Sequence, residues 1–276
     1  MNAHVWLEHA AIVIALAFVL AAACEWSRVS AALPALLTIV AGVSTIGLIA
    51  LVANHVIFPF NIDLMESVVL QHARRAMHGQ SIYPLPTPQY VPLAYNALLY
   101  VVAIPFLWIF GDTLTTLRVI SVLGLAGSGA AIFVMVRNAT RSAWWGAIAT
   151  GLFCAAYFAM DAYLDSAHSD AWLMCCALWG TYLVGRESRG ARMSGIIVLV
   201  AAFWFKQHGA VFCGAALCYL AWREGIRKAA PYWLVAFVLG AVLYVVAPGP
   251  LFGPEFHYFT WKVPGGWSEL KGHTFY

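Results

Sequence analysis

Two carboxylates, Asp63 and Glu66, stand three positions apart at the start of a polar stretch and are of a type that can do acid–base chemistry. A carboxylate held near a substrate hydroxyl can take its proton. Two acids at the beginning of a helix also have a structural use, because they accept hydrogen bonds from the free N–H groups there and complement the helix dipole. Both interpretations stay open on the sequence alone.

Lys206 is the cation with the most unusual place in the sequence. It interrupts an apolar run over 196–205, and another apolar run begins at Gly209. An ionisable group at membrane depth is costly and usually functional, although a lysine at the end of a short helix also snorkels to the surface. Arg118 opens a different apolar run, and an arginine with a lysine suits an anion such as phosphate. Neither cation has an obvious salt-bridge partner nearby in sequence, so we expect both to be uncompensated.

Asp165, His168 and Asp170 form a third polar group, in a segment that contains no Lys or Arg. Carboxylate oxygens and an imidazole are metal-ligand types, but their spacing here has no defined pattern such as H-E-x-x-H. A polar loop at the mouth of an apolar helix accounts for the same charges. The sequence therefore leaves a divalent metal as one alternative and a polar loop as the other, and it identifies no cofactor.

The composition identifies the environment of these residues. Hydrophobic residues make up 63% of the chain and charged residues 10%, with a mean hydropathy of +0.80, whereas soluble proteins are about 45–50% apolar and about 25% charged. These values predict an all-α, polytopic transmembrane helical bundle whose partner is membrane lipid. A net charge of +3 is too small to indicate a nucleic acid partner. The six cysteines lack C-x-x-C spacing, so we interpret them as small packing residues.

Apolar runs suited to membrane helices recur along the chain. The predicted spans are 5–24, 34–58, 114–136, 142–160, 171–185 and 231–247, with a divided pair at 193–205 and 209–222. Four parts follow from them. They are N-terminal transmembrane helices (1–58), an extracytoplasmic loop with juxtamembrane helices (59–113), a transmembrane bundle (114–247) and the start of a further extracytoplasmic loop (248–276). Gly124, Gly127 and Gly129 lie within one span and indicate close helix packing.

Loop charge gives the expected orientation, because Lys and Arg accumulate on the cytoplasmic side. Basic residues mark three inside loops, near 137–141, 186–192 and 223–228. The acidic segment 161–170 lies between the first two and is therefore outside. The run 92–110 contains two prolines, which suit a bent helix on the outer surface better than a span. We therefore expect 59–113 to lie wholly outside.

The outer loop begins with an expected surface helix over 61–78, ended by Gly79. Its periodicity puts Asp63, Glu66, Ser67, Leu70 and Arg74 near one face and makes Leu64, Met65, Val68, Val69 and Ala76 the apolar face. A proline-rich stretch over 81–90 follows and stays out of helix. Its tyrosines either stack on a sugar or lie at the level of the lipid headgroups.

A succession of short motifs runs from the outer loop to the divided helix pair. It consists of Glu66, Gly79, Tyr83, Pro92-Leu93, Tyr95 and Phe110-Gly111, followed by Arg118, Asp170 and Lys206-Gln207. This order resembles the GT-C superfamily of membrane glycosyltransferases, in the branch that includes protein O-mannosyltransferases and the aminoarabinose transferase of lipid A. The resemblance covers about 59–270, and its specificity comes from the order of the motifs.

The resemblance implies an enzyme that moves a sugar from a polyprenyl-phosphate donor to an acceptor hydroxyl, with inversion, outside a bacterial plasma (inner) membrane. Asp63 or Glu66 would be the catalytic base. The residues implied to bind substrate are Tyr83, Tyr95, Arg118, Asp170, Lys206 and Gln207, with Arg118 and Lys206 at the lipid phosphate. No nucleotide-binding fold is required, because the donor is linked to a lipid. The sequence does not define the sugar or the acceptor.

This chain departs from the family pattern. Met65 stands where the acidic pair has its Asp, and Val91 replaces the Lys or His that often precedes the Pro-Pro-Leu turn. Family members usually carry more spans beyond the loop that begins near Pro248, so we expect a C-terminally truncated or unusually short member.

Two other functions stay open. In a transporter or lipid flippase, Lys206 and the outer acids would bind a moving solute. That function predicts internal repeats with broken helices in both halves, and the sequence offers one broken pair, around Lys206. The other alternative is a noncatalytic membrane subunit or a fragment.

Overall fold

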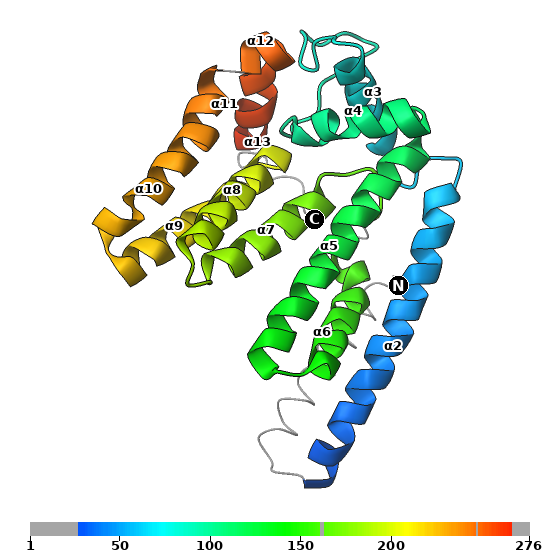
Figure 1. The fold of residues 1–276 in the computed structure, drawn as a ribbon. Coiled ribbons are helices and arrows are strands. Elements are labelled where there is room, and N and C mark those ends of the chain that lie inside the picture. The colour runs from blue at the N-terminus through cyan, green and yellow to red at the C-terminus, as the bar shows by residue number, and fades with distance from the viewer. Residues whose placement is uncertain (1–26, 161–162, 247, 267–276) are drawn as a thin grey trace. The chain divides into compact units, whose positions relative to one another are not determined.

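A computed structural model describes residues 27–160, 163–246 and 248–266 (Figure 1). Over these residues the chain forms helices and loops, and its β-structure is one isolated bridge between Thr87 and Tyr90. The all-helical prediction is therefore confirmed for the described part. The predicted first span, 5–24, and Cys24 lie outside the described residues.

The helices follow one another with short connections. They are α2 (Ser27–Ile57), α3 (Glu66–Met77), α4 (Leu98–Phe110), α5 (Leu114–Thr140), α6 (Ala143–Ala155), a 3₁₀ turn (Tyr157–Met160), α7 (Asp170–Val184), α8 (Arg189–Phe205), α9 (Gly209–Glu224), α10 (Ile226–Ala236), a π-helical segment (Phe237–Val242), α11 (Leu243–Val246), α12 (Pro248–Phe252), a second π-helical segment (Tyr258–Lys262) and α13 (Val263–Gly266). The predicted spans over the described residues each correspond to helix.

Three helical stretches of the described chain are long and apolar enough to cross a membrane, namely Ala32–Ile57, Leu114–Thr140 and Ile226–Val246. α4, α6 and α7 are shorter apolar helices. α4 has 13 residues, which at about 1.5 Å per residue give about 20 Å, less than the roughly 30 Å of a bilayer core. The described chain thus has three helices that could span a membrane, whereas α4, like the equally short α6, is shorter than a bilayer core.

The chain divides into two compact units, and the first combines residues 1–51 with 132–162. Its helices approach closely at small residues. A Cβ added to Gly151 would lie 2.4 Å from the Cβ of Ala41, and one added to Gly146 would lie 2.9 Å from the carbonyl oxygen of Phe133. This is the usual way in which membrane helices gain packing contact.

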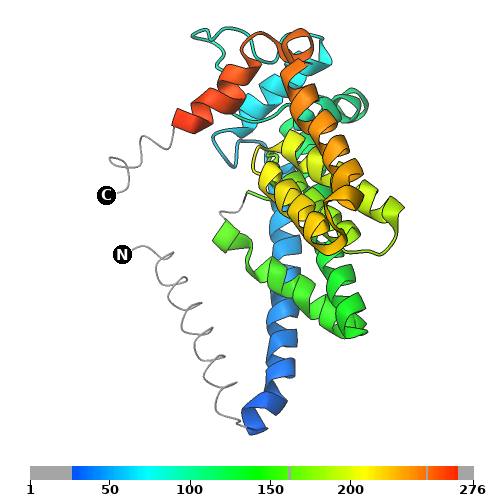
Figure 2. The ribbon, with the colours of Figure 1, turned by 90° about the vertical axis from the view of Figure 1, so that its left-hand side faces the viewer.

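The second unit, 52–131 with 163–276, contains every predicted site residue. Within it α7, α8, α9 and α10 pack in succession as neighbouring helices (Figures 1 and 2). The predicted packing role of the α5 glycines is confirmed for Gly124 and Gly127. A Cβ added to Gly127 would lie 2.6 Å from the Sγ of Cys175, and a Cβ added to Gly124 would lie 3.0 Å from the carbonyl carbon of Ala171 in α7. Trp172 and Trp179 of α7 donate indole N–H bonds to α5 carbonyls, at 2.9 Å and 3.0 Å.

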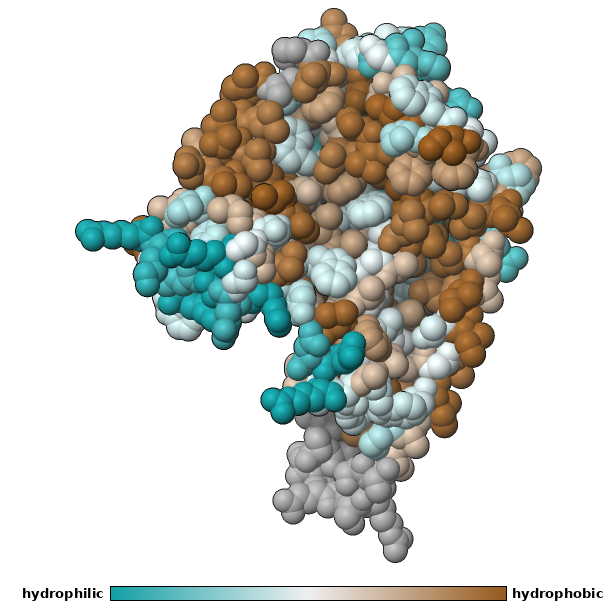
Figure 3. All heavy atoms as spheres, viewed as in Figure 1, coloured by the Kyte–Doolittle hydropathy of each residue, from teal (hydrophilic) through white to brown (hydrophobic). Residues whose placement is uncertain are grey.

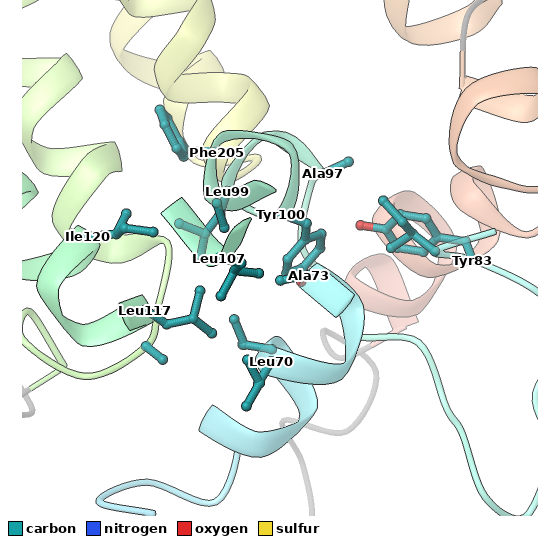
Figure 4. Packing of buried hydrophobic residues seen from close by; sticks show 14 of the residues in the cluster. Leu70, Ala73, Tyr83, Ala97, Leu99, Tyr100, Leu107, Leu117, Ile120 and Phe205 are labelled. Atoms are coloured by element: carbon teal, nitrogen blue, oxygen red, sulfur yellow. The ribbon is translucent and has the colours of Figure 1, made fainter. Parts of the chain in front are cut away.

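An apolar core joins α3, α4 and the adjoining helix ends of this unit (Figure 4). It combines side chains of α3 (Leu70, Ala73), α4 (Leu99, Tyr100, Leu107), α5 (Leu117, Ile120) and the end of α8 (Phe205). Short helices that could not bury an apolar face alone are stabilised by this shared burial. The core therefore fixes the helix ends that carry the predicted site residues.

The predicted outer helix begins later than its periodicity indicated. α3 starts at Glu66 and not at 61, so Leu64 and Met65 lie before the helix, where they are 90% and 39% exposed. Their assignment to the apolar face was wrong, and so was the assignment of Glu66 to a polar surface, since Glu66 is fully buried. The predicted end is confirmed. Gly79 adopts φ +66°, and the N–H groups of Gly79 and Gln80 donate to the carbonyls of Ala76 and Arg75, as in a Schellman motif.

His72 of α3 hydrogen-bonds the non-helical segment between α3 and α4, at Leu93. Its Nδ1 lies 2.7 Å from the Val68 carbonyl oxygen and donates to it, while its Nε2 accepts the backbone N–H of Leu93 at 2.9 Å. A ring that donates on one nitrogen and accepts on the other is neutral. The pKa of His72 is lowered from 6.5 to about 4, mainly by burial and to a smaller extent by the charge of Arg75, while the hydrogen bond to Val68 opposes the shift.

We predict that this histidine makes the fold sensitive to mild acid. Because the unfolded chain takes up the proton near pH 6.5 and the folded protein near 4, the His72 contribution is complete above 6.5 and is lost as the pH falls toward 4. The expected loss is about 3 kcal/mol of unfolding free energy. Denaturant titrations in micelles at pH 7.5 and 4.5 measure it. His72→Phe should flatten the dependence, whereas His78→Gln, at an exposed position just after α3, should retain it.

Candidate functional site

A fully buried ion pair joins Arg118 of α5 and Glu66 of α3 within the second unit. The guanidinium donates to both carboxylate oxygens, from Nε to Oε1 at 2.9 Å and from Nη2 to Oε2 at 2.6 Å. Its other N–H groups donate to backbone carbonyls, from Nη1 to His55 at 2.8 Å and Phe58 at 2.5 Å, and from Nη2 to Phe60 at 2.6 Å. All five guanidinium donors are therefore used.

The Glu66 carboxylate is equally saturated. Besides Arg118 it accepts the backbone N–H of Ile62 on Oε2 at 2.7 Å and that of Ala167 on Oε1 at 2.9 Å. Burial raises the pKa of Glu66, but the hydrogen bonds from Arg118, Ile62 and Ala167 together outweigh burial and hold it below its usual value. The expectation that Arg118 lacks a compensating acid was wrong, because the partner is 52 residues away in sequence. The pair joins the turn after α2, the start of α3 and the loop before α7.

Asp63 lies beside this pair but remains accessible. Its Oδ2 accepts the backbone N–H of Met65 at 2.8 Å and lies 2.8 Å from Nε2 of His168. Burial raises the pKa of Asp63, and the hydrogen bonds from His168 and Met65 more than offset this, so that its pKa lies below the usual value. The hydrogen bonds with Met65 and His168 both fall on Oδ2, so Oδ1 keeps lone-pair capacity for a hydroxyl donor. The carboxylate therefore combines a local hydrogen bond from the backbone with an open oxygen.

Lys206 lies at the predicted break between two helices, and the break is confirmed. α8 ends at Phe205, and Lys206 itself is extended, with φ −156° and ψ 141°. α9 begins at Gly209, where an added Cβ would lie 2.1 Å from the backbone nitrogen of Phe203, so that only glycine fits. The expectation of an unpaired cation was again wrong, because Nζ of Lys206 donates to Oδ1 of Asp170 at 2.7 Å.

His168 connects these two parts into one polar row, Asp63–His168–Asp170–Lys206. Its Nε2 faces Asp63, and its Nδ1 lies 3.8 Å from Oδ2 of Asp170. The His168 side chain is 4% exposed, whereas those of Asp63, Asp170 and Lys206 are 21%, 25% and 17% exposed. The row therefore opens to the surface at its acids and at its ammonium group, around a buried imidazole.

Aromatic rings surround the row. Tyr163 stacks on the His168 ring with centroids 5.1 Å apart, and Tyr95 approaches the same ring edge-on at 6.2 Å. The ammonium of Lys206 lies 5.0 Å from the centroid of the Tyr95 ring, within cation–π range. Burial, with the nearby charges of Asp170 and Asp63, raises the pKa of Tyr95 to about 12, so its hydroxyl stays protonated at neutral pH.

Two other predicted substrate-binding residues, Tyr83 and Gln207, donate side-chain hydrogen bonds to backbone carbonyls. Tyr83 is fully buried and its hydroxyl donates to the Tyr95 carbonyl, while its backbone joins the segment around Phe252 and Glu255. Gln207 donates from Nε2 to the carbonyls of Ala94 and Thr260, at 3.0 Å and 2.7 Å. These contacts hold the extended stretch, the helix break and the 248–266 segment together. Their predicted contact with a substrate stays a prediction.

The metal alternative finds no support in the described part of the chain, where no group of three His, Cys, Asp or Glu side chains is arranged to hold an ion. Asp165 points to His55, with Oδ2 2.7 Å from its Nδ1, and Asp170 points to Lys206. Asp165 is therefore paired apart from the other two candidates, while His168 and Asp170 belong to the same polar row. Sequence reasoning weighed His168 only as a metal ligand and missed its contact with Asp63, and no local signal indicates a partner 105 residues away.

An apolar groove of about 610 Å³ lies between α8, α9, α10 with its π-helical continuation, and the 257–262 segment. Its lining includes Phe203 and Ala210, on either side of the Lys206 break, and Tyr244. Lys262 and His257 are the polar residues at its border. In Figure 3 the neighbouring surface of α10 and α11 is hydrophobic, while hydrophilic side chains gather where α9 meets α10. The apolar lining of this groove suits a hydrocarbon chain, and two of its residues, Phe203 and Ala210, lie three and four positions from Lys206 in sequence.

Comparison with known proteins adds no assignment, since no family model, curated protein or solved structure matches this chain.

We predict that the buried ion pair is required for the fold. Arg118→Met removes one partner and leaves the buried Glu66 charge uncompensated, which typically costs about 3–5 kcal/mol. Adding Glu66→Gln should restore part of this loss. The matched control is the exposed pair of Arg74 and Asp112, 44% and 48% accessible, where Arg74→Met should cost less than about 1 kcal/mol. Unfolding in micelles measures all variants, and equal effects at the two arginines would contradict the prediction.

Proposed function

We propose that the protein is a membrane glycosyltransferase that moves a sugar from a polyprenyl-phosphate donor to an acceptor hydroxyl on the extracytoplasmic side. The observation that carries the proposal is the combination of an accessible carboxylate and an accessible ammonium in one polar row, next to an apolar groove. A lipid-linked donor needs both environments, since its chain is apolar and its phosphate is anionic. The resemblance of the motif order to GT-C glycosyltransferases supports the same function.

The geometry favours Asp63 over Glu66 as the base. The acceptor capacity of Glu66 is filled by Arg118, Ile62 and Ala167, and the residue is fully buried. Asp63 is partly exposed and keeps its carboxylate ionised through the hydrogen bonds that hold its pKa low. Lys206 is likewise favoured over Arg118 as the phosphate ligand, because the five donors of Arg118 are occupied. The buried pair would then act as the support of the site.

In the proposed reaction, the acceptor oxygen attacks the anomeric carbon from the face opposite the phosphate. The hydroxyl proton moves to Asp63, the new glycosidic bond forms, and the bond between the anomeric carbon and the phosphate oxygen breaks. Its electrons leave with the polyprenyl phosphate. The Lys206 ammonium stabilises the negative charge that develops there, which is the usual electrostatic contribution of a fixed cation.

The expected sidedness follows from loop charge and the position of the site. The exposed basic residues around the α9–α10 turn, Arg223, Arg227 and Lys228, mark a cytoplasmic end. The polar row lies at the other end of α8 and α9, with the 59–113 loop. We place the catalytic end outside a bacterial plasma (inner) membrane.

Removal of the proposed base should abolish transfer while leaving the fold intact. Asp63→Asn keeps the size of the side chain and an oxygen for Met65, so we expect a loss of about 10²–10⁴ in rate. Release of polyprenyl phosphate from undecaprenyl-phosphate hexose and pentose donors, in nanodiscs, measures it. A donor consumed at the wild-type rate by Asp63→Asn would exclude Asp63 as the base.

Lipid-phosphate binding should depend on the Lys206 charge. Farnesyl phosphate should bind the wild-type protein, while farnesol, which has the same hydrocarbon chain but no phosphate, measures the contribution of that hydrocarbon chain alone. We expect Lys206→Met to weaken farnesyl phosphate binding about 10- to 100-fold, as for a lost charged hydrogen bond. Lys228→Met removes an exposed lysine in α10 and should not change it. Equal binding by both variants in a ³¹P NMR titration would argue against the phosphate site.

The proposed orientation requires the 59–113 loop to lie wholly outside. In a Cys-free background, single cysteines at Gln89 and Asp112, both exposed, should label in intact cells with a membrane-impermeant maleimide. They lie on opposite sides of α4, so labelling of Asp112→Cys alone would show that this segment crosses the membrane.

A further inference from the structure

The Asp170 carboxylate is shared between two neighbours in the polar row. Its Oδ1 accepts from the Lys206 ammonium at 2.7 Å, and its Oδ2 lies 3.8 Å from Nδ1 of His168, beyond hydrogen-bond distance. The other ring nitrogen of His168 lies 2.8 Å from Oδ2 of Asp63. His168 therefore lies between the proposed base and an acid that is held away from it by a lysine.

We propose that His168 is a positioning residue for Asp63 and that an anion bound at Lys206 releases Asp170 to hydrogen-bond His168. The inference rests on the proposed function, since the anion is taken to be the phosphate of the lipid donor. It adds a coupling that the proposed function does not contain. When phosphate occupies the site at Lys206, the hydrogen bond from His168 to Asp63, the proposed base, becomes stronger.

Charge balance favours this rearrangement. Lys206 has a single carboxylate partner on Asp170, and a phosphate group that enters beside the ammonium competes for it with a larger negative charge. The freed carboxylate needs to approach Nδ1 by only about 1 Å to reach the 2.7–2.9 Å of a charge-assisted hydrogen bond. A His168 imidazolium that donates to both Asp63 and Asp170 would then balance the negative charge of Asp170, which Lys206 no longer compensates.

The His168 ring is held in the orientation that this coupling requires. The stacked Tyr163 ring and the edge of Tyr95 restrict it from two sides, and the side chain is 4% exposed. The backbone is fixed as well, because the His168 N–H donates to the Ser166 carbonyl at 2.7 Å and its carbonyl accepts from Ser121 Oγ at 3.3 Å. The charged and titratable groups facing the ring are thus Asp63, Asp170, Tyr95 and Tyr163, with Lys206 next in the row.

The test observes His168 directly. Full-length protein with ¹⁵N-histidine is placed in nanodiscs at one fixed pH, and the His168 ring signals are assigned by their loss in His168→Gln. Farnesyl phosphate, whose binding is followed separately by ³¹P NMR, should shift the Nδ1 signal toward the hydrogen-bonded, protonated position. Farnesol should leave it unchanged.

Asp170→Asn separates the coupling from binding. Because this variant removes the carboxylate that competes with phosphate for Lys206, farnesyl phosphate should bind about 2- to 5-fold more tightly, while the Nδ1 signal of His168 should no longer respond. Asp112→Asn, which breaks the exposed pair with Arg74, is the matched control and should behave as wild type.

The outcomes distinguish the two proposals. Binding of farnesyl phosphate to the wild type without a change at His168 would overturn the coupling and leave the phosphate site standing. Weaker binding in a folded Asp170→Asn variant would overturn the competition on which the coupling depends. Absence of binding by the wild type would overturn both the coupling and the proposed phosphate site.

Discussion

The Arg118 guanidinium has to be neutralised and fully hydrogen-bonded because it is buried at the end of an apolar helix. An isolated charge there would cost several kcal/mol of stability. The chain avoids this cost by bringing three separate segments to the guanidinium group. Glu66 supplies the countercharge, the last turn of α2 and the segment after it supply three carbonyl groups, and the backbone N–H of Ala167 donates to Glu66. The positions of Asp63 and His168 follow from this arrangement, since each lies within three residues of a segment that the pair fixes.

A second constraint acts at the helix break. The end of α8 and the start of α9 approach so closely that Gly209 has no room for a side chain, and this forces Lys206 out of the helix. Gln207 then satisfies carbonyls from the extended stretch and from the 258–262 segment, at Ala94 and Thr260. Lys206 donates to Asp170 at the first turn of α7, and the polar row thus combines residues from three parts of the chain, namely the segment before α3, the start of α7 and the α8–α9 break.

The sequence indicated the helical class, most helix bounds, the break at Lys206, the end of α3 at Gly79 and the packing role of the α5 glycines. These features depend on local composition and periodicity. It did not indicate which charges pair. Glu66 with Arg118 and Asp63 with His168 are separated by 52 and 105 residues, and such contacts depend on how the helices assemble. The start of α3 was misjudged for a related reason, because Leu64 and Met65 continue the apolar period while the Glu66 ion pair fixes the first turn.

The same neutralisation limits what the site can bind. Each charged side chain of the polar row and of the buried Arg118–Glu66 pair has a partner of opposite charge or a histidine, so a ligand anion at this site does not enter an empty positive pocket. The anion has to displace a carboxylate from its cation. This displacement costs least free energy at the partly exposed pair of Lys206 and Asp170 and most at the buried Arg118. An amphiphilic ligand has an advantage in such an exchange, because burial of its chain in the neighbouring groove contributes a favourable free energy of about 25 cal/mol per Å² of apolar area. On the proposed function, the groove would supply affinity for the hydrocarbon chain, and the exchangeable Lys206–Asp170 ion pair would give selectivity for an anionic headgroup.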